Sequence, residues 1–287
     1  MGIFFEENVI TSKLSAIKVG GAARFITYPK NIEELRGIIQ ISRELRLPHK
    51  VIGGLSNTFF SDDGYKGILI SLKRMHSIII GENSFKISAG EPLSGVIRHL
   101  SLKNISFLPE LIGIPGTVGG AVRNNAGAFS KEISEAFLLG EFYDPSEDKV
   151  FYLDKKDLNF SYRSSLLQRS DIILLNAEFA SELRSCEECG NIMHEIIAKR
   201  KASHPKEPSL GSFFKRSGNV IPSLLIDKAG LKGFSVGGAE VSKKHAGFII
   251  NKGKATAKDV LDLSYRIEER IKSIFGVSLE REAEYVK

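Results

Sequence analysis

A glycine-rich stretch in the middle of the chain is the clearest candidate for a ligand-binding segment. Residues 113–128 read GIPGTVGGAVRNNAGA, with five glycines, one proline, two adjacent asparagines and no acidic residue. Backbone can approach a phosphate closely only where side chains are absent, and its N–H groups can then bind the anion. Such positions are supplied by Gly113, Gly116, Gly119 and Gly120. The spacing fits neither G-x-G-x-x-G nor G-x-x-x-x-G-K-[ST], which disfavours Rossmann and P-loop sites.

A second loop of the same kind occurs earlier. GGLSNTFFSDDG, residues 53–64, follows directly after KVI, which we expect to be a strand. Two glycine-rich loops suggest the two arms of one extended cofactor. Each loop alone is equally well explained as a tight turn, because glycine-rich turns are common.

Three polar side chains stand in motifs that could carry chemistry. Arg163 lies in FSYRSS, Ser212 in LGSFFKR and Glu282 in LEREAE. Taken alone, they are explained as a surface arginine, a turn serine and part of a solvated charged edge. GSFF is not the G-x-S-x-G of an esterase, so the sequence disfavours a serine hydrolase.

The only two cysteines form CEEC, at Cys186 and Cys189. His194 and His204 do not complete a zinc-finger spacing, and no βαβ pattern places the pair as in thioredoxin. The two intervening glutamates disfavour a reactive thiolate at this motif. We expect two reduced thiols at the start of a helix, with a redox or metal role as the alternative.

Composition indicates a globular protein with a sizeable core. Of its residues, 42% are hydrophobic and 26% are charged, as in ordinary globular proteins. The length of 287 residues suggests two domains or one domain with an additional lobe. No window approaches eighteen consecutive apolar residues, and the N-terminus lacks the features of a secretory signal. We therefore expect a cytoplasmic protein that enters no membrane.

The net charge of +6 is spread along the chain, with dense basic patches only at residues 199–206 and 241–245. These patches indicate either a solvated basic face or attraction of a phosphorylated small molecule. The absence of a long basic stripe with interleaved aromatic residues argues against nucleic acid as a partner.

Hydrophobic periodicity and breaker residues predict a mixed α+β protein. Predicted helices cover residues 31–46, 93–103, 187–202, 222–230 and 256–275. Predicted strands cover residues 50–52, 67–72, 77–81, 85–90, 150–153, 172–180, 247–251 and 279–286. The segment SHPKEPSLG contains Pro205 and Pro208, which should prevent regular structure and mark a domain boundary.

Seven ordered motifs together resemble the UDP-N-acetylenolpyruvoylglucosamine reductase family, along nearly the entire chain. They are IKVGGAARFITYPKNIEEL, VIGGLSNTFFSDDG, IPGTVGGAVRNNAGA, DLNFSYRSS, PSLGSFFKR, LIDKAGLKGFSVGGAEVSKKHAGFIIN and LEREAE. The length resembles that of the family's compact second subtype. The resemblance implies a vanillyl-alcohol-oxidase-like (PCMH-type) FAD-binding domain of two lobes at residues 18–184. It also implies a smaller α+β substrate-binding domain at residues 201–287.

The resemblance further implies an enzyme that uses FAD and NADPH to make UDP-N-acetylmuramate, a peptidoglycan precursor. Arg163 would stabilise negative charge on the intermediate, Ser212 would protonate C2, and Glu282 would act with the arginine. The implied FAD-binding residues are Gly53, Gly54, Leu55, Ser56, Asn57, Gly113, Ile114, Pro115, Gly116, Thr117, Gly119, Gly120, Asn125, Ala126 and Gly127. The implied residues for the nucleotide sugar are Arg200, Lys215 and His245. No metal is implied.

Two alternatives belong to other functional classes. Arg216 stands where the family usually has asparagine, and AEYVK after Glu282 replaces the usual VRIIG. These departures keep open a nucleotide-binding module without catalysis. A flavin oxidase acting on another substrate is the second alternative. Neither glycine-rich loop contains histidine or cysteine, which argues against covalently attached flavin. We expect a monomer whose partners are small molecules.

Overall fold

The structure, a computed structural model, describes residues 3–287 and consists of two compact units. Unit 1 comprises Met1–Glu6, Ile26–Gly54 and Gly67–Arg200, and unit 2 comprises Glu7–Phe25, Leu55–Lys66 and Lys201–Lys287. Unit 2 thus includes two early segments as well as the C-terminal part of the chain. The expected domains at residues 18–184 and 201–287 stay a prediction. Within residues 3–287, no helix combines the length and the apolar character that crossing a membrane requires.

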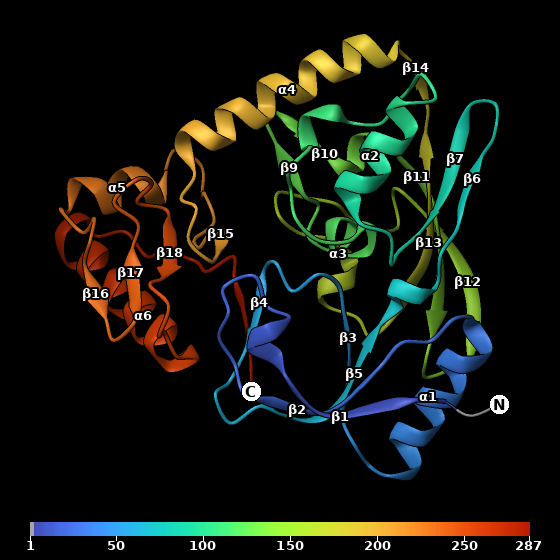
Figure 1. Ribbon diagram of the computed structural model, residues 1–287, viewed down its shortest axis with the longest axis horizontal. Helices are drawn as coiled ribbons and strands as arrows, with labels where there is room; N and C mark the ends of the chain where they lie inside the picture. Colours follow the sequence, from blue (N-terminus) through green and yellow to red (C-terminus); the bar gives the residue numbers. More distant parts are fainter. Residues whose placement is uncertain (1–2) are drawn as a thin grey trace. The chain divides into compact units, whose positions relative to one another are not determined.

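Unit 1 contains a five-stranded antiparallel sheet with the order β12-β11-β13-β7-β6 (Figure 1). Its strands are β6 (Ile78–Ile80), β7 (Ser84–Ser88), β11 (Phe137–Asp144), β12 (Lys149–Asp154) and β13 (Ile173–Ala180). Phe85 and Phe179 of this sheet pack with Phe107 and Phe137, with ring centroids 4.8 to 5.9 Å apart. All four rings are buried, so this aromatic cluster fixes one face of the sheet.

A second sheet has the order β1-β2-β5-β3. Its strands are β1 (Phe5–Ile10), β2 (Ala22–Thr27), β3 (His49–Ile52) and β5 (Tyr65–Ser71). Strands β3 and β5 are parallel. Helix α1 (Ile32–Glu44) precedes β3, as the sequence predicts. The helix begins after Asn31 because the side chain of Asn31 accepts the N–H of Glu34 at 2.9 Å and caps it.

The other elements of unit 1 are short, except for the helix that carries the cysteines. They are α2 (Leu93–Ser101), α3 (Val118–Arg123), α4 (Cys186–Ser203), and the strand pairs β8 (Ile105–Ser106) with β14 (Glu182–Leu183) and β9 (Gly127–Ala128) with β10 (Lys131–Glu132). Cys186 is the first residue of α4, and both cysteines are free thiols, as expected. Only residues 186–200 of α4 belong to unit 1.

Unit 2 contains a four-stranded antiparallel sheet in the order β15-β18-β17-β16, with α6 packed on it (Figure 1). The elements are β15 (Ser209–Ser212), α5 (Pro222–Lys228), β16 (Ser235–Val236), β17 (Ala239–Val241), β18 (Phe248–Asn251) and α6 (Ala257–Phe275). A separate parallel pair joins β4 (Thr58–Phe60) to β19 (Glu284–Val286).

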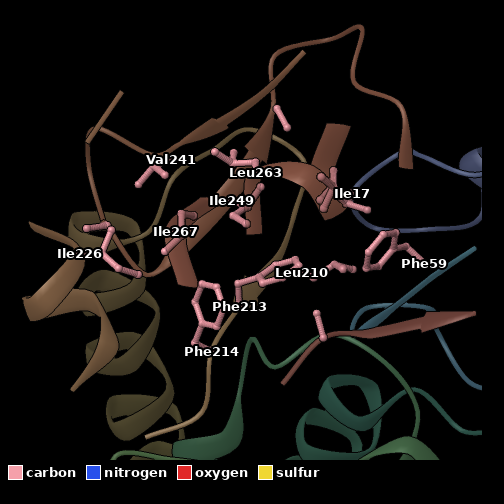
Figure 2. Close-up of a cluster of buried hydrophobic side chains, with 14 of the residues drawn as sticks. Ile17, Phe59, Leu210, Phe213, Phe214, Ile226, Val241, Ile249, Leu263 and Ile267 are labelled. Atoms are coloured by element: carbon pink, nitrogen blue, oxygen red, sulfur yellow. The ribbon is translucent and has the colours of Figure 1, made fainter. Parts of the chain in front are cut away.

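Helix α6 is positioned by a capping box at its start and a glycine at its end. Thr256 and Asp259 exchange side-chain to backbone hydrogen bonds, and Gly276 adopts a left-handed conformation with φ of 70°. The buried face of α6 includes Leu263 and Ile267. Figure 2 shows these two side chains in one cluster with others from β15, β17 and β18 and from the segment after β15.

The structure corrects three of the sequence predictions. The glycine-rich stretch contains a short helix, α3, because Thr117 caps it and Val118, Ala121 and Val122 are buried on one face. The segment SHPKEPSLG is partly regular, since β15 begins at Ser209.

The predicted strand at residues 279–286 is shorter than expected and begins only at Glu284. Glu282 donates its N–H to the carbonyl of Phe213, whereas Glu284 donates its N–H to the carbonyl of Asn57. The segment therefore changes its pairing partner between these two residues. This change interrupts the alternation on which a single strand face depends.

Candidate functional site

The two glycine-rich loops meet in unit 1, backbone against backbone. A Cβ atom added to Gly54 would lie 2.8 Å from the Cα of Gly116, and one added to Gly53 would lie 2.8 Å from Thr117 Oγ1. Gly116 also has a φ of 112°, a conformation that residues other than glycine rarely adopt. Gly53 and Gly54 are exposed. The contact therefore presents bare backbone to solvent, which is the kind of surface a phosphate group can approach.

The backbone N–H groups at the start of α3 are hydrogen-bonded within the protein. The N–H groups of Val118, Gly119 and Gly120 donate to Glu91 O, Ala89 O and Thr117 Oγ1, at 2.9, 2.8 and 3.3 Å. A Cβ on Gly119 would lie 3.1 Å from Ala89 O, so close packing explains this glycine. The backbone N–H groups of these three residues therefore already have acceptors within the protein.

Asn125 links the glycine-rich stretch to the turn that carries Arg163. Its side-chain amide donates to Glu132 Oε2 at 2.8 Å and to Ser161 O at 2.9 Å. Its side-chain oxygen accepts the N–H of Ser134 at 3.3 Å. Because the residue is buried, these contacts hold the segment through its side chain rather than through its backbone alone.

Arg163 itself lies against the end of the glycine-rich stretch. Its Nη2 donates to the carbonyl of Gly127 at 2.7 Å, and its guanidinium carbon lies 5.0 Å from the ring centroid of Tyr162. Its φ of 53° is left-handed, which is unusual for a residue with a side chain. Gln168 donates to the carbonyl of Arg163 at 3.0 Å and supports this turn.

Arg200 is a largely buried cation near the end of α4. Its guanidinium carbon lies 5.4 Å from the ring centroid of Phe129, and its Cδ would be 3.1 Å from a Cβ on Gly113. Its Nε and Nη2 atoms are buried and have no hydrogen-bond partner among residues 3–287. Burial lowers the pKa of Arg200 below its ordinary value. Buried charges are normally paired, so this environment fits an anion supplied by a ligand.

Ser212 and Glu282 belong to neighbouring segments of unit 2. Ser212 is the last residue of β15 and pairs with Phe248 of β18. The residue after Ser212, Phe213, accepts the N–H of Glu282 at 2.9 Å. Ser212 is exposed and Glu282 is partly exposed, so both are accessible from solvent in this unit.

The expected substrate residues of unit 2 already have contacts within it. Lys215 Nζ forms an ion pair with Glu280 Oε1 at 2.6 Å. His245 Nδ1 accepts the N–H of Gly247 at 3.1 Å, and its ring packs 4.9 Å from that of Phe248. Burial is the largest cause that lowers the pKa of His245, so the ring is neutral at pH 7.

The segment of the first loop that belongs to unit 2 holds the chain around Glu282. Asn57 Nδ2 donates to the carbonyl of Glu282 at 2.9 Å, and the carbonyl of Asn57 accepts the N–H of Glu284 at 2.9 Å. Leu55 is buried and has a φ of 47°. Its carbonyl accepts the N–H of Ala16 at 3.0 Å.

The sequence analysis did not predict two residues that support the glycine-rich stretch. Ser94 Oγ accepts the N–H of Gly113 at 3.1 Å and donates to the carbonyl of Ile114 at 3.2 Å. Glu132 accepts from Asn125. Ser94 lies 19 residues before Gly113 in a predicted helix, so no local pattern connects them.

Comparisons with known proteins cover both parts of the chain. The family model "FAD binding domain" matches residues 23–140, and the model "UDP-N-acetylenolpyruvoylglucosamine reductase, C-terminal domain" matches residues 203–286. The predicted α+β fold with an FAD-binding domain is thus confirmed.

Curated relatives and a solved structure match the chain over its length. The UDP-N-acetylenolpyruvoylglucosamine reductase of Caldicellulosiruptor saccharolyticus is 39% identical over 290 residues, covering 100% of this chain and 93% of the relative. That of Clostridium novyi is 36% identical over 282 residues, covering 98% and 92%. The crystal structure of the reductase from Thermus caldophilus is similar with a TM-score of 0.85 and 30% identity, covering 100% of both chains. The chain therefore belongs to the UDP-N-acetylenolpyruvoylglucosamine reductase family of FAD-dependent oxidoreductases.

Proposed function

We propose that this chain reduces UDP-N-acetylglucosamine enolpyruvate to UDP-N-acetylmuramate with NADPH as the reductant and FAD as the bound cofactor. The product is a precursor of peptidoglycan. The observation that carries the proposal is the similarity to the Thermus caldophilus reductase over 100% of both chains, since it includes the FAD-binding part and the C-terminal part together. The family membership and the FAD-binding domain support the same reaction.

FAD would be held chiefly by backbone. The exposed glycines 53 and 54 and the adjoining Gly116 offer a surface without side chains, which suits a pyrophosphate. We assign FAD binding to Gly53–Asn57, Gly113–Thr117, Gly119, Gly120 and Asn125–Gly127. When bound, FAD supplies hydride transfer between NADPH and the alkene carbon of the sugar substrate.

Arg163 would stabilise the negative charge that develops on the enolpyruvyl group. A guanidinium remains charged at every working pH and can bind a carboxylate through two hydrogen bonds. Its position supports this role because the contact with Gly127 O restricts the guanidinium next to a segment assigned to FAD binding. Preorganised charge of this kind is the largest single contribution in many enzymes.

Ser212 would donate the proton that C2 of the substrate receives, and Glu282 would assist on the same intermediate. A serine hydroxyl is a weak acid, so it needs a neighbour that stabilises its conjugate base or relays a proton. The hydrogen bond between the N–H of Glu282 and Phe213 O keeps the two segments together in unit 2. This arrangement supports a shared task for the two side chains.

Arg200, Lys215 and His245 would bind the nucleotide sugar. The buried N–H groups of Arg200 without partners among residues 3–287 support an anionic group of the substrate as their acceptor. Because His245 is neutral at pH 7, it would contribute a hydrogen bond rather than a charge. We also propose that the protein is a cytoplasmic monomer and that its domains follow the limits 18–184 and 201–287.

A spectroscopic experiment tests this function. The purified protein should show flavin absorption bands, NADPH should bleach them, and the enolpyruvyl sugar should restore them. Ser212→Ala should leave bleaching by NADPH intact and abolish restoration by the sugar. Ser217→Ala is the matched control, because Ser217 is also exposed in unit 2 and pairs with Val220 through its backbone.

Each failure has a distinct meaning. Protein that stays colourless when FAD is added would contradict the cofactor assignment. Flavin that is bleached but reoxidised only by oxygen would indicate an oxidase. Cofactor binding without steady NADPH consumption would indicate a non-catalytic nucleotide-binding module. Normal turnover by Ser212→Ala would remove the serine from its role as proton donor.

A further inference from the structure

The chain around Glu282 is paired through its backbone with the segment directly after Ser212. Glu282 donates its N–H to Phe213 O at 2.9 Å, and Arg281 forms an isolated antiparallel bridge with Phe214. Phe213 and Phe214 are buried in the core of unit 2 (Figure 2). The main chain of Glu282 is therefore attached to a part of the core that begins directly after Ser212.

The side chain of Arg281 is held by two residues of α6. Its Nε and Nη2 bind Glu268 Oε1 and Oε2 at 2.5 and 3.1 Å, which is a two-pronged ion pair. Its guanidinium carbon also lies 4.0 Å from the ring centroid of Tyr265. Tyr265 and Glu268 are three residues apart, so they lie on the same side of the helix. The cation is thus fixed along one edge and over one face.

We call the contacts of Arg281 with Glu268 and Tyr265 the clamp. Helix α6 gives this clamp a rigid base. Val260, Leu263, Ile267 and Ile271 are at most 1% exposed, and the helix has a capping box at its start. Two further hydrogen bonds connect the first turn to Asp62, which accepts the N–H groups of residues 257 and 258 at 2.8 and 2.9 Å. A side chain bound to α6 is therefore bound to the core of unit 2.

The ion pair between Arg281 and Glu268 is partly shielded from solvent. The side chains of Arg281 and Glu268 are 21% and 26% exposed, whereas those of the ion pair Lys258–Asp262 on the same helix are 75% and 36% exposed. Burial tends to lower the pKa of Arg281, but the hydrogen bonds to Glu268 and Tyr265 outweigh it and raise this pKa. Arg281 therefore keeps its charge, and the two-pronged geometry distinguishes it from a freely rotating surface pair.

We propose that Arg281, held by Glu268 and Tyr265, is a positioning residue that fixes the main chain carrying Glu282 relative to Ser212. The inference rests on the proposed function, in which Glu282 and Ser212 act on the substrate. Arg281 acts through its neighbour and touches no reacting atom. A misplacement of about 1 Å can cost about a hundredfold in rate. Loosening the clamp should therefore slow the step at the substrate and spare flavin reduction.

Two variants open the clamp from opposite sides. Arg281→Met removes the cation and keeps much of the apolar stem, and Glu268→Gln removes one charge with little change in shape. Lys258→Met is the matched control, because Lys258 and Asp262 also form an ion pair on α6 but lie on its exposed surface. Should Arg281→Met fail to fold, Glu268→Gln and Arg281→Lys decide the question.

The first measurement is amide hydrogen exchange of the holoenzyme, which does not depend on activity. In both clamp variants, exchange at the N–H of Glu282 should accelerate at least tenfold, while the buried turns of α6 keep their protection. Lys258→Met should leave both unchanged. Unchanged exchange at Glu282 in the clamp variants would overturn the proposal, even if the proposed reaction itself proved wrong.

The second measurement separates the two half-reactions by stopped flow. Reoxidation of the reduced flavin by the enolpyruvyl sugar should slow at least tenfold, and reduction by NADPH should stay within twofold of wild type. The effect should fall on kcat rather than on KM for the sugar. Equal slowing of both half-reactions would indicate a general loss of structure and overturn positioning. Absence of sugar-dependent turnover in the wild type would instead contradict the proposed function.

Discussion

Arg163 Nη2 donates a hydrogen bond to the carbonyl of Gly127 at 2.7 Å, which holds this guanidinium against the end of the glycine-rich stretch. The residue also has a left-handed φ of 53°, which is uncommon for a residue with a side chain. The bond to Gly127 gives the planar guanidinium a purpose that a lysine ammonium cannot reproduce, because the two groups differ in shape and in the number of donors.

Arg163→Lys should therefore lower the rate at which the sugar substrate reoxidises reduced flavin by about 100-fold or more, in the range found for the loss of one charge-stabilising donor. Flavin reduction by NADPH should change less than about threefold, since no charge develops on the substrate in that step. Stopped-flow absorbance measures both rates. Arg169→Lys is the control, as Arg169 is exposed in the same loop region. Equal rates for Arg163→Lys and wild type would contradict the catalytic assignment.

Gly54→Ala should weaken FAD binding, because the added Cβ would lie 2.8 Å from the Cα of Gly116 and the two loops would have to separate. We expect the dissociation constant for FAD to rise at least tenfold, which corresponds to about 1.4 kcal/mol. Titration of FAD into deflavinated protein, followed by fluorescence, measures this change.

The control for this prediction is Gly190→Ala in the interior of α4, where an added Cβ has no atom within 4 Å apart from its chain neighbours and the backbone of its own helix. That substitution should stabilise the protein by about 0.5–1 kcal/mol through helix propensity and leave FAD affinity unchanged. If Gly54→Ala binds FAD as tightly as Gly190→Ala, the close contact of the loops does not shape the cofactor site.

The elements that could be predicted from sequence are those whose signals are local. Helix α6 combines Thr256, Asp259 and Gly276 with an apolar stripe, and all of these signals lie within one stretch of chain. The seven motifs likewise identify the family, because each is a contiguous string. Helix α3 was not predicted, because glycines at 119 and 120 suggest a loop. Gly119 is explained by its close packing on Ala89, and the N–H of Gly120 binds Thr117 Oγ1, the cap of the helix.

What could not be predicted depends on pairs that are distant in sequence. Strand β11 was not expected because Gly140 and Glu141 interrupt its pattern, and it also shifts register against β13 after Glu141. Strand β4 pairs with β19, so Thr58 lies opposite Glu284, with no local signal at either end. The contacts of Arg163 with Gly127 and of Asn57 with Glu282 are of the same kind.

Tyr143 should make stability depend on pH in alkaline solution. Burial, followed by the hydrogen bond from its hydroxyl to Asp148 Oδ1 at 2.9 Å, raises the pKa of Tyr143 to about 12. In the unfolded chain this pKa is about 10, so between these values the unfolded state loses its proton while the folded state keeps it. The free energy of unfolding should therefore fall as the pH rises from 10 towards 12.

Urea unfolding of wild type and Tyr143→Phe at pH 9 and pH 11 measures this contribution. The loss of stability between the two pH values should be smaller in the variant. Contributions that do not involve Tyr143 are common to both proteins and cancel in the comparison. The same loss in both proteins would show that the hydroxyl of Tyr143 is not protected on folding.

Arg200→Met should separate binding from stability. Because Nε and Nη2 are buried without a partner among residues 3–287, and burial lowers the pKa, the charge contributes little to folding and its removal should leave the melting temperature unchanged or higher. If the missing partner is the diphosphate of the substrate, affinity for UDP-N-acetylglucosamine should fall about 10- to 100-fold, as expected for a charged hydrogen bond. Calorimetric titration measures the affinity, and Arg98→Met, an exposed arginine of α2, is the control. A lower melting temperature with unchanged affinity would mean that Arg200 serves the fold through its packing on Phe129, and the nucleotide sugar would then need another cation.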